Sequence, residues 1–144
     1  MVNITTTGLF MFGLFILGIG LMICFVNLQT SILSSCTSLK LKNYLNGVLV
    51  LSIISLTLPI SYMLCNSKCS KQSVSVESKF SSFMYIFIVF ALGVTIITLG
   101  VFIKNELSNI NCNQNNNFSD GAMIGLGSIY LFIGVVMSWL LFKK

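Results

Sequence analysis

The sequence predicts an all-α membrane protein: four transmembrane helices in an up-down bundle, with both termini on the same face. Of the 144 residues, 56% are hydrophobic and only 8% are charged, whereas soluble domains carry about 25% charged residues. Four apolar stretches are each long enough to cross a bilayer, which takes about 20 residues. The connections between them are too short to bury cores of their own, so residues 1–144 are expected to form a single membrane domain.

The four predicted spans cover approximately residues 8–27, 44–65, 80–103 and 121–142, and none contains Asp, Glu, Lys, Arg or His. A transmembrane β-barrel would need alternating polarity, which these stretches lack. The first span has no basic residue before it and no small-x-small cleavage pattern after it. We therefore expect it to be a permanent helix and not a signal peptide.

Lysine placement predicts the orientation of the chain. The formal net charge is +5, and every basic residue is a lysine. The face with the termini and the middle connection carries Lys68, Lys71, Lys79, Lys143 and Lys144, and the opposite face carries Lys40, Lys42 and Lys104. This excess predicts cytoplasmic termini. Because the lysines flank helices without forming a dense cluster, the expected partner is the anionic surface of a lipid bilayer and not nucleic acid.

Glycines recur at helical spacing in three of the spans. Positions seven apart return to nearly the same helix face, and small residues let membrane helices approach closely. The favoured interpretation is helix packing within the bundle. The alternative is a homo-oligomer contact through the small-xxx-small motif Gly121-x-x-x-Gly125. The predicted packing residues are Gly13, Gly20, Gly93, Gly100, Gly121, Gly125, Gly127 and Gly134.

The second span is the most polar of the four. Pro59 has no N–H to donate and is expected to bend the helix, and neighbouring hydroxyls can bond to the carbonyl it frees. The favoured interpretation is a kinked packing helix whose hydroxyls bond to their own backbone. The alternative is a hydroxyl-lined pathway for a small solute. The hydroxyl residues are Ser52, Ser55, Thr57 and Ser61.

The five cysteines divide between the membrane and its two faces. Cys24 lies within the first span and is expected to be a small core residue. Cys36 and Cys112 fall in the first and third connections, so a disulfide between them would join the two helical hairpins if that face is oxidising. Cys65 and Cys69 lie beside the end of the second span, among lysines, and are candidates for palmitoylation. Two unmodified thiols are the alternative for this pair.

Several function classes are disfavoured by what the sequence lacks. Ion-coupled transporters, proton pumps and voltage sensors keep ionisable groups inside the membrane, and the predicted spans have none. The chain has no His and its cysteines are scattered, so no haem, iron or zinc site is indicated. Phosphate loops, paired carboxylates and a Ser/His/Asp set are also missing. We therefore expect no enzymatic activity, no metal and no cofactor.

These features favour a non-enzymatic structural component of a larger membrane-associated assembly, with other membrane or shell proteins as partners. The use of lysine without arginine, together with abundant Ile, Asn and Phe, suggests an AT-rich genome. Two settings fit this bias: the internal membrane of a large DNA virus particle beneath its capsid, and an organelle complex of a protist. The alternative function is an oligomeric channel or small-solute facilitator lined by the second span. A membrane thiol oxidoreductase is a distant third, because no Cys-x-x-Cys motif is present.

Overall fold

In the computed structural model, four long α-helices make up nearly all of the described residues. They are α1 (Ile4–Ser35), α2 (Leu39–Cys69), α3 (Glu77–Asn109) and α4 (Asn117–Phe142). The structure describes residues 4–35, 38–69, 77–109 and 117–142, with side chains for 9–30, 38–64, 83–109 and 121–140. The predictions of an all-helical chain and of four helices long and apolar enough to cross a membrane are confirmed.

The helices extend beyond the apolar segments that the sequence marks. Helix α1 has 32 residues, or roughly 48 Å at about 1.5 Å per residue, whereas the hydrocarbon core of a bilayer is about 30 Å thick. The segments apolar enough to lie in a membrane are Leu9–Thr30, Leu39–Leu64, Phe83–Asn109 and Gly121–Leu140. Much of the first predicted connection, 28–43, is therefore helical. A helix pairs its own backbone groups and need not end where the apolar residues end.

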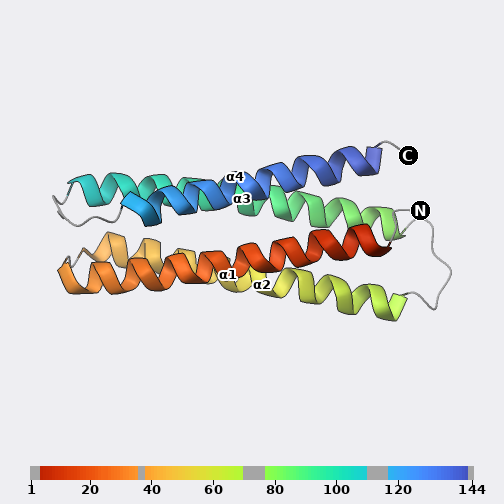
Figure 1. Cartoon of the computed structure of the whole chain (residues 1–144), viewed down its shortest axis with the longest axis horizontal. Helices are drawn as coiled ribbons and strands as arrows, with labels where there is room; N and C mark the ends of the chain where they lie inside the picture. Colours follow the sequence, from red (N-terminus) through yellow and green to blue (C-terminus); the bar gives the residue numbers. More distant parts are fainter. Residues whose placement is uncertain (1–3, 36–37, 70–76, 110–116, 143–144) are drawn as a thin grey trace.

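The four helices lie side by side along their lengths, with α1 beside α2 and α3 beside α4 (Figure 1). The contact between α3 and α4 is the most extensive and that between α1 and α2 is next, while contacts of α1 with α4 and of α2 with α3 join the two pairs. Within the described residues, the diagonal pairs α1–α3 and α2–α4 do not bring Cα atoms within 8 Å. The helices therefore occupy the four corners of a bundle.

Contacting residues on α3 and α4 run in opposite chain order. Gly93 lies against Leu131, and Gly100, further along α3, lies against Ile124, which is earlier on α4. Helices α3 and α4 are therefore antiparallel.

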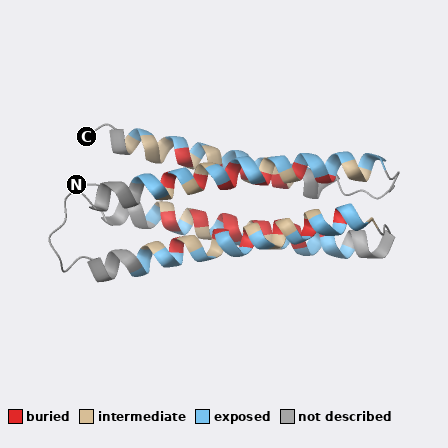
Figure 2. Ribbon diagram, turned by 180° about the vertical axis from the view of Figure 1, so that it is seen from behind, coloured by how far each residue is buried: buried red, intermediate tan, exposed pale blue. Residues whose placement is uncertain are grey.

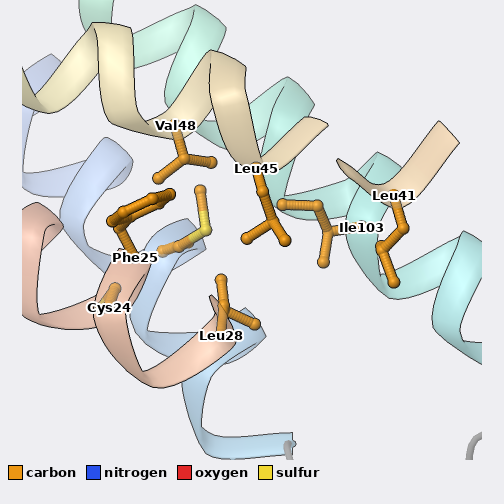
Figure 3. Close-up of a cluster of buried hydrophobic side chains, with 8 residues drawn as sticks. Cys24, Phe25, Leu28, Leu41, Leu45, Val48 and Ile103 are labelled. Carbon is orange, nitrogen blue, oxygen red and sulfur yellow. The ribbon is translucent and has the colours of Figure 1, made fainter. Parts of the chain in front are cut away.

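Two clusters of buried apolar side chains fill the interior. In the first cluster, side chains of α1 point towards those of α2, and Ile103 of α3 lies beside them (Figure 3). Both clusters draw on more than two helices, so the interior belongs to the bundle as a whole. The first consists of Cys24, Phe25, Leu28, Leu41, Leu45, Val48, Ile103 and Met123. The second consists of Met11, Leu14, Leu17, Leu21, Val89, Leu92, Ile96 and Tyr130.

The outer surface of the bundle is also apolar. Exposed residues lie mainly on the outward sides of the helices and buried residues on the facing sides (Figure 2). Large hydrophobic side chains such as Leu9, 72% exposed, and Phe132, 69% exposed, are among them. Soluble monomers seldom expose apolar surface on this scale, whereas lipid chains solvate it. This surface is compatible with a multi-pass membrane protein.

Glycine brings the backbones of α3 and α4 together. A Cβ atom at Gly127 would lie 2.6 Å from Cγ1 of Ile97 and 3.0 Å from the carbonyl oxygen of Gly93. At Gly93, a Cβ atom would lie 3.1 Å from the carbonyl oxygen of Gly127. Because part of this obstruction is backbone, a side-chain rotation cannot relieve it. These two glycines permit a close backbone approach in the α3–α4 pair.

Not every predicted packing glycine faces a neighbouring helix. Another helix lies within 4 Å of a Cβ atom built at Gly20, Gly93, Gly100, Gly127 or Gly134, but nothing lies within 4 Å at Gly13, Gly121 or Gly125. On α4 the reason is angular. Two residues turn a helix by about 200°, so Gly125 and Gly127 point to opposite sides. Only the side with Gly127 and Gly134 packs against α3. This corrects the expectation that Gly121 and Gly125 pack within the chain.

We expect Gly127→Ala to lower the free energy of unfolding by about 1–3 kcal/mol, as overpacking of a tight interface does. The matched control is Gly13→Ala, where the added methyl meets no atom within 4 Å, and stability should stay the same or rise slightly. Unfolding by SDS in mixed micelles, followed by circular dichroism, measures both variants. Equal stability of the two would contradict the close backbone approach.

Candidate functional site

The polar residues of α2 do not share one face. Ser52 and Ser55 are 0% and 1% exposed, and Pro59 is also buried. Their spacing of three and then four residues places them on one side of the helix. Thr57 and Ser61 are exposed. The four hydroxyls that would line a solute pathway thus divide between the interior and the outer surface of this chain.

Most hydroxyls in the described helices bond to their own backbone. The Ser52 Oγ donates to the Leu49 carbonyl at 2.8 Å and the Ser61 Oγ to the Leu58 carbonyl at 2.8 Å. Such bonds satisfy the hydroxyl without a partner from another helix. The same bonding to a carbonyl three or four residues earlier occurs at Thr30, Thr57, Thr95, Thr98, Ser128 and Ser138.

Ser55 differs from these residues. Its Oγ is buried and has no partner in hydrogen-bonding geometry, and the same is true of the Tyr130 hydroxyl on α4. Each residue is only 1% exposed. The two side chains lie near each other in the bundle, but their hydroxyls do not meet the geometric criteria of a hydrogen bond. A buried polar group without a partner is costly, so this pair is the chemically distinctive feature of the interior.

Pro59 affects a third polar atom, the backbone carbonyl oxygen of Ser55. A helical carbonyl normally accepts from the N–H four residues later, and proline has no N–H. The carbonyl of Ser55 therefore loses its regular donor. The sequence indicates that a neighbouring hydroxyl could replace this donor. In the described part of the chain, the hydroxyls of Ser52, Thr57 and Ser61 bond to other carbonyls instead.

Aromatic pairs tie α2 to α3 near both ends of the bundle. Tyr62 and Tyr85 meet edge to face with ring centroids 4.7 Å apart, and the hydroxyls of Ser61 and Tyr85 are 3.3 Å apart. At the other end, Tyr44 stacks on Phe102 at 5.8 Å. Tyrosines near span ends commonly anchor a helix at the lipid headgroups. These pairs are consistent with that anchoring and form no enclosed site.

The cysteine predictions fall mostly outside the described residues. Cys24 is a free, buried thiol within the first apolar cluster, as expected of a core residue. Cys36 and Cys112 lie beyond the described chain and side-chain ranges, as do the side chains of Cys65 and Cys69. Among the side chains that are described, no group of three or more His, Cys, Asp or Glu residues is placed to hold a metal ion.

Two residues that matter in this structure were not singled out by the sequence analysis. Tyr130 lies in the middle of its span, unlike Tyr44, Tyr62 and Tyr85, which lie near span ends. That central position was the available signal, because a phenol at such depth needs a polar partner. Gly18 was missed because it lies outside the seven-residue spacing. Its Cβ would meet Leu56 of α2 at 2.9 Å.

Comparisons of the chain with protein-family models, curated proteins and solved structures find no match. The functional argument therefore rests on the burial, bonding and exposure of the residues themselves. Those properties identify two features: the buried pair of Ser55 and Tyr130, and an exposed surface of α4 at Gly121 and Gly125.

Cysteine accessibility measures whether the hydroxyls of α2 line a water-filled path. In a background without other cysteines, we expect Ser52→Cys and Thr57→Cys to resist a charged, membrane-impermeant thiol reagent. The first side chain is enclosed by the bundle and the second faces outward from an apolar segment. Asn105→Cys, at an exposed position beside Lys104, is the reactive control. Rapid labelling of Ser52→Cys in intact proteoliposomes would contradict the expected dry environment.

Proposed function

We propose that this protein is a non-enzymatic structural component of a larger membrane-associated assembly. We further propose that it crosses the bilayer four times as an up-down bundle with both termini on one face. The four apolar helices support this topology, as does the reversed order of contacts along α3 and α4. In Figure 1 the start of α1 and the end of α4 lie at the same end of the bundle. The four spans predicted from the sequence contain no Asp, Glu, Lys, Arg or His that chemistry or ion coupling would use.

The observation that carries the proposal is the outward glycine face of α4. Gly121 and Gly125 are exposed, and nothing in the chain lies within 4 Å of a Cβ atom built on either. Ser128, Phe132 and Val135 continue the same exposed stripe at spacings of three or four residues. We name these five residues the α4 outer stripe. It begins with small residues and ends with large apolar ones.

The physical reason for expecting a partner on the α4 outer stripe is close packing. Lipid is as apolar as leucine, so helices associate in a membrane through van der Waals contact, and glycine lets two backbones approach. Inside the chain, Gly93 and Gly127 already use this device between α3 and α4. At Gly121 and Gly125, the α4 outer stripe has no side chain that would keep a helix from outside the chain at a distance. A partner helix seated there would cover Phe132 as well.

A second copy of this chain is the partner we favour for the α4 outer stripe. Gly121 and Gly125 are four residues apart, so two identical helices related by a two-fold axis can set small residues against small residues. Membrane or shell proteins of the assembly would then bind the resulting oligomer. The internal membrane of a large DNA virus particle and a protist organelle membrane remain the two proposed settings, on the compositional argument alone.

We expect Gly125→Leu to weaken association of the protein in liposomes by about tenfold or more, because the new side chain blocks backbone approach. Loss of a close interface worth about 1.4 kcal/mol is enough for that factor. Gly13→Leu is the matched control, since it also adds a side chain to a glycine with nothing within 4 Å. Energy transfer between labelled copies, measured against the protein-to-lipid ratio, gives the association constant.

Gly134→Leu serves a different purpose in this experiment. A Cβ atom at Gly134 would lie 3.1 Å from the Phe90 ring, so this variant should disturb the bundle itself. Reduced association of Gly125→Leu with unchanged unfolding supports the proposal. A pull-down in mild detergent measures whether Gly125→Leu also keeps its co-purified proteins. If this variant associates normally both with other copies and with those proteins, the α4 outer stripe is not an assembly surface.

Topology provides a separate prediction. With epitope tags at both ends, we expect antibodies to reach both tags after the plasma membrane alone is permeabilised, because the lysine excess favours cytoplasmic termini. A cysteine at Asn105 should react only from the opposite side. Tags on opposite sides would contradict four spans, and two lumenal tags would contradict the lysine-based orientation.

A further inference from the structure

We propose that the centre of the bundle holds a single internal water molecule, bound by the hydroxyls of Ser55 and Tyr130 and by the Ser55 carbonyl. The two hydroxyl oxygens are buried without a partner in hydrogen-bonding geometry. The carbonyl lacks its regular donor because residue 59 is proline. The site would connect α2 to α4, which lie diagonally across the bundle.

The hydrogen-bonding capacity of these groups matches one water molecule. The Tyr130 hydroxyl has one proton to donate and the Ser55 carbonyl has none, so a water molecule can accept from the first and donate to the second. Its remaining proton can go to the Ser55 Oγ. That gives three bonds, within the range of two to four that buried waters make in proteins. One molecule would thus give each of the three oxygens a hydrogen-bond partner.

The chemistry of the site favours a neutral occupant over an ion. Both side chains are uncharged at neutral pH, and none of the four predicted spans contains Asp, Glu, Lys, Arg or His. A divalent cation prefers six or more oxygen ligands, several of them carboxylates, and this site offers three neutral oxygens. A small neutral molecule that can both donate and accept hydrogen bonds therefore fits best, and water is the smallest of these.

The position of the site gives the water a structural role. Helices α2 and α4 belong to different hairpins, and within the described residues their Cα atoms do not approach within 8 Å. The contacts that join the two hairpins are less extensive than those within them. A water held by Ser55 and Tyr130 would add a directional link between the hairpins, which apolar contacts alone do not provide.

Ser52 is an internal control for this proposal. It lies on the same buried side of α2 and is 0% exposed. Its hydroxyl is already satisfied, because it donates to the Leu49 carbonyl at 2.8 Å. Two serines of one helix, equally enclosed by the bundle, thus differ in whether they need an outside partner.

Water-edited solid-state NMR on the full chain in liposomes, labelled with ¹³C at serine and tyrosine, tests the proposal directly. Magnetisation that starts on water should reach Cβ of Ser55 and Cζ of Tyr130, and it should not reach Cβ of Ser52. In Tyr130→Phe, which keeps the ring and removes the hydroxyl, transfer to Ser55 should fall to the level of Ser52. Pro59→Ala restores an N–H for the Ser55 carbonyl and should also reduce the transfer.

The outcomes are distinguishable. In Tyr130→Phe and Pro59→Ala, magnetisation from water should still reach the serines at the ends of the helices. That result shows that each variant is still correctly inserted in the membrane. Transfer to neither Ser52 nor Ser55 in the parent protein would overturn the water site, and a direct bond between the two hydroxyls would then be the explanation. Equal transfer to both serines would also overturn it, in favour of a continuous water-filled path. Neither outcome bears on the α4 outer stripe.

Discussion

The structure depends on the need to pair every backbone polar group where there is no water. A continuous helix meets this need with its own hydrogen bonds, which explains why helices dominate the described chain. Once the helices exist, their association needs close contact, because apolar side chains gain little by exchanging lipid for one another. Glycine supplies that contact at Gly93 and Gly127, where each backbone obstructs a side chain on the other. The interior clusters and the paired helices follow from this approach.

Helix α4 presents two glycine faces, and the bundle can use only one. Gly127 and Gly134 pack against α3, so Gly121 and Gly125 turn outward. Glycine therefore has two roles on this helix. On one side it lets α4 pack closely against α3, and on the other it leaves an exposed surface without protruding side chains. That division links the packing of the chain to its proposed role in an assembly. A protein whose predicted spans contain no Asp, Glu, Lys, Arg or His has few other means of specific recognition in a membrane.

Among the described residues, the hydroxyls of Ser55 and Tyr130 depart from this apolar design, as does the Ser55 carbonyl, which lacks its regular donor because residue 59 is proline. Hydroxyls elsewhere in the described helices bond to carbonyls of their own helix and so make few demands on their surroundings. The Ser55 and Tyr130 hydroxyls are fully enclosed and make no such bond. In a medium of low dielectric constant, a polar atom without a hydrogen-bond partner has a higher free-energy cost than the same atom in water. A hydrogen bond in that medium is also stronger, so it fixes the relative orientation of the groups that it joins. This site can therefore define how the two hairpins fit together.

By itself, the sequence determined that the protein consists of helices, how many there are and approximately which residues are apolar enough for a membrane. These properties depend on the local run of hydrophobic residues. Periodicity also placed Gly127 with Gly134, and Ser52 with Ser55, on common faces. Only the tertiary structure decided which face turns inward, because the rotation of a helix about its axis depends on its neighbours. That rotation buries both Tyr130 and Ser55, exposes Gly125, and separates Thr57 from the serines with which the sequence had grouped it.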